Sequence, residues 1–229
     1  MRALDITTSV LATVARAGSG AAVGSLGARP KKPLELYDFE ACPYCRKVRE
    51  ALSILDLEAI VYPCPKGGSR FRERLKKLGG KVQCPYLVDP NTGTAMYESD
   101  DIVAYLFATY GSGSAPLTLR LGVLTLAGSA LASLARLTHG EHYRTARAPE
   151  KPLELWSFEA SPFCRLVREE LTVLELPYLL HSVAKGSPSR AAFIERSGRM
   201  MVPYLADPNT ATEMFESADI IAYLRRTYA

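Results

Sequence analysis

The stretch KPLELYDFEACPYCR, residues 32–46, decides the fold, because the chain repeats it with few changes as KPLELWSFEASPFCR at residues 151–165. Two later segments are also repeated: PYLVDPNTG at 85–93 returns as PYLADPNTA at 203–211, and YESDDIVAYL at 97–106 returns as FESADIIAYL at 215–224. The offset is 119 residues for the first segment and 118 for the other two, so one residue was gained or lost between them. The chain therefore contains an internal duplication.

Each unit of this duplication shows the alternation of strands and helices of a small α/β domain. In the first unit, residues 42–55 place Val48, Leu52 and Leu55 on one face of a helix. The other expected elements are strands at 34–37 and 59–62, a basic helix at 71–78, a hairpin of 86–88 with 94–97, and a last helix from Glu98 or Ser99 to Tyr110. Right-handed crossovers leave few arrangements for this βαβαββα order. The sequence predicts two tandem thioredoxin-like domains.

An apolar helical segment is expected before each unit. The first covers residues 6–15, and the second, residues 117–137, is apolar nearly all round, as helices buried in protein or lipid are. It has 15 uncharged residues between Arg120 and Arg136, fewer than the ~20 that a bilayer requires. Packing against the first segment and the domains is therefore favoured over membrane association. The expected domains are a helical leader at 1–31, domain 1 at 32–111, a helical linker at 112–150 and domain 2 at 151–229.

The composition indicates a globular chain with thiol chemistry. Of 229 residues, 48% are hydrophobic and 23% charged, which excludes disordered and collagen-like chains. The net charge of +4 is small and spread along the sequence, so nucleic acid is not an expected partner. Five cysteines are too few for a disulfide scaffold, and the first apolar stretch is too short for a secretory signal, so a reducing compartment is expected.

The tetrad Cys42-Pro43-Tyr44-Cys45 stands where the first expected strand is followed by a helix. Unpaired N–H groups at a helix N-terminus lower the pKa of a thiol placed there, and Pro43 suits the first helical position. Cys42 is therefore expected to be the exposed nucleophile. Cys45, one turn deeper, is expected to resolve a mixed disulfide formed on Cys42.

A CxxC pair can also be half of a zinc site or two buried cysteines without chemistry. A zinc site usually needs a second ligand pair. The chain has no second CxxC, and its three histidines, His139, His142 and His181, are distant from the tetrad in sequence. Thiol chemistry is favoured, and no metal is expected.

Two further residue pairs are expected beside the tetrad. A cis proline at Cys84-Pro85 would set the Cys84 backbone beside the thiol and offer peptide groups to an extended peptide, whereas a trans proline at a strand start is the alternative. Glu98 and Ser99 open the last helix. Its N–H groups and the Ser99 hydroxyl would bind a carboxylate while Glu98 accepts from an ammonium, and capping alone is the alternative.

Together these motifs resemble the glutathione transferase N-terminal domain and its relative glutaredoxin, over the whole of each unit. The resemblance implies glutathione as a cosubstrate that lies against Tyr44. It implies that Cys84 with Pro85 holds the cysteinyl backbone of glutathione and that Glu98 with Ser99 holds its γ-glutamyl end. The tandem arrangement is similar to duplicated thioredoxin-fold proteins of plant and algal chloroplasts, and that likeness alone implies a chloroplast location.

The second unit lacks the nucleophile, since a serine stands in its place. Some glutathione transferases use a hydroxyl there to stabilise the bound thiolate, so the resemblance leaves open a second glutathione site or a pure scaffold. The residues of that possible site are Ser161, Cys164, Val202, Pro203, Glu216 and Ser217.

Two other features have a favoured interpretation without chemistry. Cys64 and Cys84 would both lie on the site side of the sheet, but the second unit has Val183 and Val202 there, which favours simple burial. The basic run is interpreted as a solvated helix face, with attraction of glutathione or an acidic protein as the alternative. Its members are Arg70, Arg72, Arg74, Lys76 and Lys77.

The sequence thus predicts a glutaredoxin-like thiol/disulfide oxidoreductase that acts through Cys42 and Cys45. Its expected partners are glutathione and proteins that carry a disulfide or a glutathionyl group. One alternative is a glutathione transferase that acts on an electrophile through Cys42 alone, although the sequence shows no all-helical domain to complete an apolar substrate pocket. The other is a noncatalytic glutathione-binding or assembly module.

Overall fold

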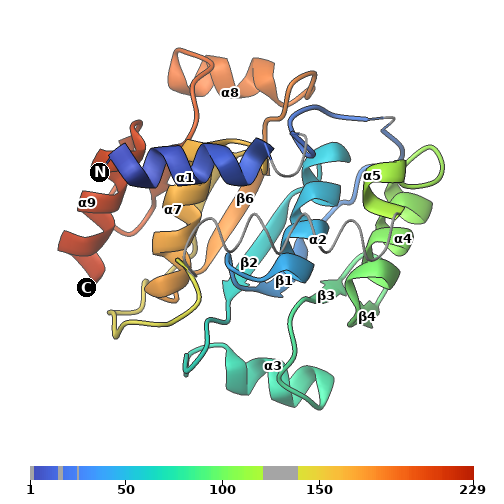
Figure 1. The fold of residues 1–229 in the computed structure, drawn as a ribbon, viewed down its shortest axis with the longest axis horizontal. Coiled ribbons are helices and arrows are strands. Elements are labelled where there is room, and N and C mark those ends of the chain that lie inside the picture. Colours follow the sequence, from blue (N-terminus) through green and yellow to red (C-terminus); the bar gives the residue numbers. More distant parts are fainter. Residues whose placement is uncertain (1–2, 15–17, 25, 121–138) are drawn as a thin grey trace.

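The computed structural model of the chain describes residues 3–14, 18–24, 26–120 and 139–229. One eight-stranded sheet, of order β4-β3-β1-β2-β6-β5-β7-β8, runs through both units, and helices cover its two faces (Figure 1). This mixed α/β architecture of two thioredoxin-like units confirms the predicted fold class.

The elements of the first unit begin and end within about two residues of their predicted bounds. They are β1 (Leu34–Asp38), α2 (Pro43–Ile54), β2 (Ala59–Pro63), α3 (Arg72–Gly79), β3 (Tyr86–Asp89), β4 (Thr94–Met96) and α4 (Ser99–Tyr110). β1 pairs with β2 in parallel and with β3 antiparallel. The strand that leads into the tetrad is therefore central in its unit.

The second unit repeats these elements and pairings. They are β5 (Leu153–Ser157), α7 (Pro162–Val173), β6 (Tyr178–Ser182), α8 (Arg190–Ser197), β7 (Tyr204–Asp207), β8 (Thr212–Met214) and α9 (Ser217–Tyr228). β5 pairs with β6 in parallel and with β7 antiparallel. The duplication seen in the sequence is thus a duplication of structure.

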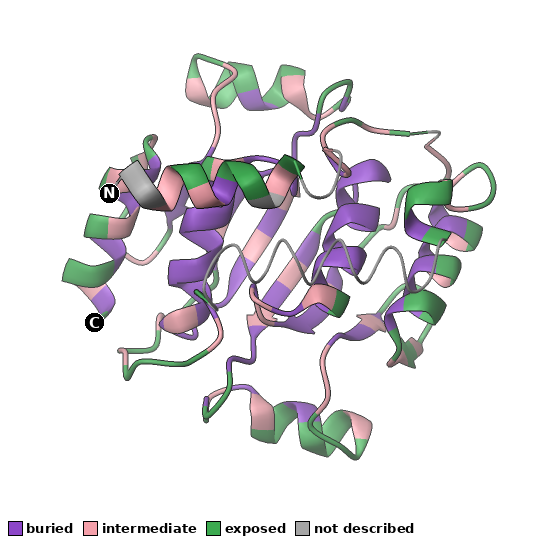
Figure 2. Cartoon of the chain, viewed as in Figure 1, coloured by how far each residue is buried: buried purple, intermediate pink, exposed green. Residues whose placement is uncertain are grey.

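Each unit has an apolar cluster on both faces of its part of the sheet, because side chains alternate along a strand. In the first unit, Leu34 and Leu36 pack under α2 and α4, whereas Tyr37 faces α3. The strands and α2 are largely buried, while α3 and α8 are mostly exposed (Figure 2). α2 therefore lies between the sheet and further protein rather than on the surface.

The two units share one sheet, which the sequence did not predict. β2 pairs antiparallel with its own counterpart β6, in the register Ala59↔Leu180, Ile60↔Leu179 and Val61↔Tyr178. An unpaired strand edge is a site of association. This pairing covers one edge of each unit with an edge of the other.

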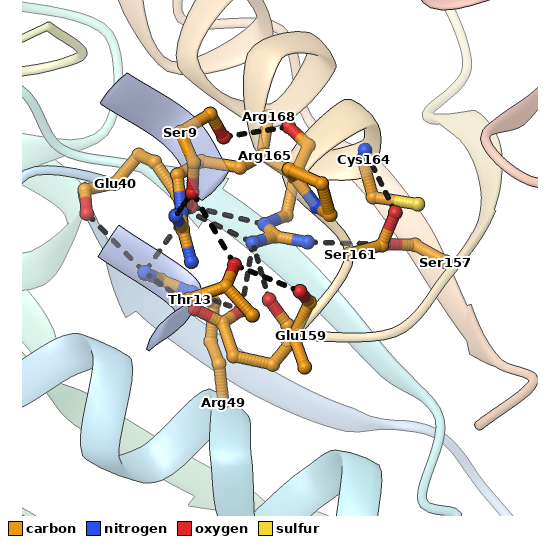
Figure 3. A network of polar contacts seen from close by, with 12 residues as sticks. Ser9, Thr13, Glu40, Arg49, Ser157, Glu159, Ser161, Cys164, Arg165 and Arg168 are labelled. Atoms are coloured by element: carbon orange, nitrogen blue, oxygen red, sulfur yellow. Dashed lines mark hydrogen bonds and ion pairs between the residues drawn. The ribbon is translucent and has the colours of Figure 1, made fainter. Parts of the chain in front are cut away.

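Charged side chains fill the interface between α2 and α7 beside this joint (Figure 3). Arg49 of α2 and Arg168 of α7 are both about 1% exposed, and each contacts both Glu40 and Glu159 at 2.9–3.2 Å. A buried charge is tolerated when it is paired and strongly destabilising when it is not. The four charges therefore fix the two units relative to each other.

The first expected leader helix is confirmed as α1 (Ala3–Val14), which packs along α7. Ser9 Oγ donates to the Pro162 carbonyl at 2.8 Å, and Thr13 Oγ1 donates to the Ala160 carbonyl at 2.9 Å. Of the second expected leader, the structure describes α5 (Leu117–Arg120), and the rest of that segment and its packing lie outside the described residues. None of the helices in the described ranges is long and apolar enough to span a membrane.

Candidate functional site

Cys42 stands at the N-cap of α2, with Pro43 as the first helical residue, as predicted. Its backbone is extended and its Sγ accepts the N–H of Cys45 at 3.4 Å. One of the unpaired N–H groups at the helix start is thus satisfied by sulfur. The thiol lies at the positive end of the helix dipole.

The prediction that Cys42 is exposed is wrong, since the residue is only 5% exposed. Its Sγ contacts the first turn of α2 through the hydrogen bond from the Cys45 N–H. Tyr44 is the exposed residue of the tetrad, at 48%.

The two thiols of the tetrad differ in acidity. Hydrogen bonding with the Cys45 thiol lowers the pKa of Cys42, and the N–H groups of Cys45 and Tyr44 and the charge of Arg49 act in the same direction against burial. Burial raises the pKa of Cys45 well above its usual value, and its hydrogen bond to Cys42 adds to this. Cys42 is therefore the more acidic thiol of the pair and Cys45 the less acidic one.

Sequence analysis did not single out Asp38, although it belongs to the same site. Asp38 ends β1, is 2% exposed, and accepts from Arg49 Nη1 at 2.5 Å. Burial raises the pKa of Asp38, and Arg49 opposes this rise. The Asp38 charge contributes to the raised pKa of Cys45. The one available sequence signal was that the otherwise similar repeat has Ser157 at this position.

The Cys84–Pro85 peptide bond is cis, as predicted. Cys84 is half-buried, whereas Cys64 is wholly buried in an apolar cluster that Cys84 also contacts. Hydrogen bonding with Cys64 raises the pKa of Cys84 well above its usual value, followed by burial and by charges that include Asp38 and Cys42. The structure therefore brings both additional cysteines beside the tetrad.

Glu98 and Ser99 stand where α4 begins. Glu98 has a φ of +64°, uncommon for a residue with a side chain, and its carboxylate accepts from Gln83 Nε2 at 2.7 Å. Its exposed side chain makes no capping bond to α4, so the alternative that it serves as a cap is wrong. Ser99 is buried as the first residue of the helix. An exposed carboxylate is thus held beside a free helix start.

Residues 36–115 and residues 155–229 each match the family model of the glutathione S-transferase N-terminal domain. The chain belongs to this family. Two glutathione transferases are among the similar solved structures: one from Bombyx mori (27% identity, 38% of this chain and 39% of that chain, TM-score 0.32) and a trimeric one from Leishmania (13% identity, 86% and 67%, TM-score 0.33). This chain therefore aligns with well under half the length of the Bombyx mori protein. No curated protein matches.

The second glutathione S-transferase N-terminal domain keeps the backbone of the first. Ser161 is the N-cap of α7 and its Oγ accepts the Cys164 N–H at 3.3 Å. The Val202–Pro203 bond is cis, Glu216 has a φ of +66°, and Ser217 is buried as the first residue of α9. Burial raises the pKa of Cys164. The predicted residues of the second site therefore have the same arrangement as their counterparts, with a hydroxyl in place of the N-cap thiol.

The basic run of the first N-terminal domain is not simply a solvated face, so that interpretation is wrong for two residues. Arg70 donates to the carbonyls of Glu175 and Ala146 at 2.6 Å, and Arg72 donates to the Cys64 carbonyl at 3.0 Å. Both therefore attach α3 to neighbouring segments. Lys76 and Lys77 are exposed, as predicted.

Within the described ranges, no three His, Cys, Asp or Glu side chains of these domains are arranged to hold a metal ion. His181 instead lies between Glu58, at 2.6 Å, and Glu154, at 3.1 Å. A cavity of about 620 Å³ lies between α4 and α5, and none of the residues that line it was predicted as a site residue.

Proposed function

We propose that this protein is a glutathione-dependent thiol/disulfide oxidoreductase that acts through Cys42 and Cys45. The observation that carries the proposal is the N-cap position of Cys42, where its Sγ accepts the Cys45 N–H at 3.4 Å. The thiol with the lowered pKa attacks, and the neighbouring thiol with the raised pKa resolves. Family membership supports a glutathione-related activity.

The cycle begins on a glutathionylated substrate. The Cys42 thiolate attacks the glutathione sulfur, and the substrate thiolate leaves and takes up a proton. The product is a mixed disulfide between Cys42 and glutathione. Cys45 then loses its proton and attacks Cys42 Sγ, which releases glutathione and leaves a Cys42–Cys45 disulfide. Alternatively, a second glutathione attacks the bound one, and oxidised glutathione leaves.

Glutathione is held in this proposal by the residues around Cys42. Tyr44 is exposed beside the thiol, and Cys84 with Pro85 offers backbone groups at the start of β3. Glu98 presents its carboxylate at the start of α4, where it would accept the glutathione ammonium, while the helix N–H groups at Ser99 receive the carboxylate. The charges of an amino-acid end match this pair.

The low exposure of Cys42 bears on the substrate. A thiolate that is 5% exposed is reached by a slim disulfide more easily than by one enclosed in a folded protein. A glutathionyl disulfide is therefore the preferred substrate over an internal protein disulfide.

The test compares three variants of the full chain. Cys42→Ser removes the nucleophile, so reduction of a glutathionylated peptide should fall to background, at least about 100-fold. Cys45→Ser should keep that reaction within about threefold, because glutathione resolves the intermediate, but should lose reduction of protein disulfides. Cys164→Ser changes the equivalent buried thiol of the second domain and should leave both activities unchanged.

Three outcomes would overturn the proposal. Full activity of Cys42→Ser would remove Cys42 from the chemistry. If the wild type reduces no disulfide but conjugates glutathione to an electrophile, and Cys45→Ser keeps that conjugation, the protein is instead a transferase. If neither domain takes up glutathione in calorimetry, the protein is an assembly module.

A further inference from the structure

We propose that Cys84 and Cys64 form a second redox pair, which receives the disulfide from Cys42 and Cys45. This inference rests on the proposed function and extends it. The first domain would then carry four electrons on four thiols instead of two electrons on two.

The four thiols lie at the same end of three adjacent strands. β1 ends at Asp38 and leads to the tetrad, and Cys64 follows β2 directly, with its N–H donating to the Asp38 carbonyl at 2.6 Å. Cys84 precedes the start of β3 by two residues. Because β2 and β3 are the neighbours of β1 in the sheet, Cys64 and Cys84 lie at the end of the sheet that carries the tetrad.

Cys84 is the thiol that interacts both with Cys64 and with the tetrad. It shares an apolar cluster with Cys64, near Tyr37 and Tyr86. Hydrogen bonding with Cys64 dominates the pKa of Cys84, and Cys84 also interacts electrostatically with Cys42 and Cys45. Cys84 is half-buried, while the other four cysteines are buried. Cys84 is therefore the least enclosed of the thiols, which suits exchange with Cys42 as well as with Cys64.

The fold does not require sulfur at these positions. Cys64 and its counterpart Val183 are both completely buried, each in an apolar cluster. Val202 likewise replaces Cys84 before the second cis proline. Valine therefore fills both places in a domain of the same fold. The thiols accompany Cys42, whose counterpart is Ser161.

The exchange balances without a further reagent. The Cys84 thiolate attacks Cys42 Sγ in the Cys42–Cys45 disulfide and releases the Cys45 thiolate. Cys64 then attacks Cys84 Sγ and releases Cys42. One S–S bond breaks and one forms, and the protons of Cys84 and Cys64 pass to Cys45 and to solvent or Cys42. The electrons that leave Cys64 and Cys84 reduce the first pair.

The direction of transfer follows from acidity. A dithiol whose reduced form is stabilised as a thiolate is the stronger oxidant. The pKa of Cys42 is lowered and that of Cys84 is raised well above its usual value. The disulfide is therefore more stable on Cys64 and Cys84, and Cys42 returns to its reduced form for a second turnover.

The experiment titrates the reduced full chain, freed of reductant, with oxidised glutathione and maps disulfide-linked peptides after alkylation. The wild type should reduce two equivalents: the first should pass through a transient Cys42–Cys45 link and end as a Cys64–Cys84 link, and the second should leave a lasting Cys42–Cys45 link. Cys64→Val, which copies Val183, should reduce one equivalent at the wild-type initial rate. Cys164→Ser should behave as the wild type.

A double variant tests whether the disulfide passes through the first pair. In Cys42→Ser/Cys45→Ser, the Cys64–Cys84 link should form at least about tenfold more slowly. An equal rate would overturn the relay. One equivalent reduced by the wild type, with no Cys64–Cys84 link, would overturn it too while the proposed function stands. No equivalent reduced would overturn both.

Discussion

The two glutathione S-transferase N-terminal domains have the same backbone but different chemistry. Both have a cis proline, an N-cap whose side chain accepts an N–H, and a glutamate of positive φ before the last helix. The differences include one acid and three thiols: Asp38, Cys42, Cys64 and Cys84 become Ser157, Ser161, Val183 and Val202. The fold therefore does not need these thiols, and their joint presence in the first domain points to a shared function.

Unlike the thiols, the buried charges are the same in both domains. Glu40 and Arg49 of the first domain recur unchanged as Glu159 and Arg168. All four lie at the interface between α2 and α7, where each arginine needs both glutamates. The buried charges that the two domains share hold the domains together, whereas the residues that differ include the thiols.

The largest effect should come from disrupting the buried ion pairs between α2 and α7, whose residues are the same in both domains. Arg168→Met leaves Glu40 and Glu159 short of one buried cation and should lower the free energy of unfolding by about 3–5 kcal/mol. Urea unfolding followed by Trp156 fluorescence measures this. The control Arg225→Met removes an ion pair whose arginine is 55% exposed and should cost about 1 kcal/mol or less. Equal costs would mean that the network does not hold the units together.

The next test returns a thiol to the second domain. Ser161→Cys in a Cys42→Ser background should create a thiol that iodoacetamide alkylates below the ordinary thiol pKa, because the Cys164 N–H and Arg168 remain. It should restore no more than about a tenth of the wild-type activity. α1 bonds the carbonyls on both sides of Ser161, and Val202 replaces Cys84. Full restoration would show that the tetrad alone distinguishes the domains.

Asp38→Ser copies the second domain at the acid. Removing a buried negative charge favours the thiolate, so the pKa of Cys45 should fall, by about one unit or less. The pH dependence of Cys45 alkylation in Cys42→Ser protein reports this pKa. Asp101→Ser, at an exposed position of α4, is the control and should change nothing. A rise in the pKa would show that losing the Arg49 partner outweighs the lost charge.

The smallest expected effect concerns the polar contact across the sheet joint. Hydrogen bonding with His181 lowers the pKa of Glu58, so this carboxylate stabilises the fold above about pH 4.5 and loses that effect as the pH falls through the lowered value. His181→Phe keeps the ring beside Trp156 and should cost about 0.5 kcal/mol at pH 7, since Glu58 is half-exposed. The loss of stability caused by His181→Phe should shrink toward pH 3. A loss that does not change with pH would come from packing instead.

Much of the fold could be predicted from sequence because it is local and repeated. The helix start at Cys42-Pro43, the strand of Leu34 and Leu36, and the cis proline after Cys84 follow from short patterns, and the second copy checks the first. The pKa of Cys42 is lowered first by hydrogen bonding with the Cys45 thiol, which the CxxC spacing provides, and then by the N–H groups of Cys45 and Tyr44 at the helix start.

Long-range pairing could not be predicted in this way. β2, which contains Ile60 and Val61, has the composition of an ordinary strand. Nothing in its sequence indicates that its edge is joined to the other unit. Arg49 follows a polar helix pattern that predicts a solvated face, but its partner Glu159 is 110 residues away. The low exposure of Cys42 could not be predicted for a related reason, because α2 is largely buried and its neighbours come from distant parts of the sequence.

The antiparallel meeting of β2 with β6 has a consequence for how this molecule can vary. Equivalent strands that pair antiparallel, with Ile60 opposite its counterpart Leu179, are related by a two-fold axis, the symmetry by which identical subunits most often associate. Here both halves belong to one polypeptide, so a substitution in one half is not copied into the other. The arrangement is a dimer in geometry whose two sides can specialise separately, one for reaction and one for support.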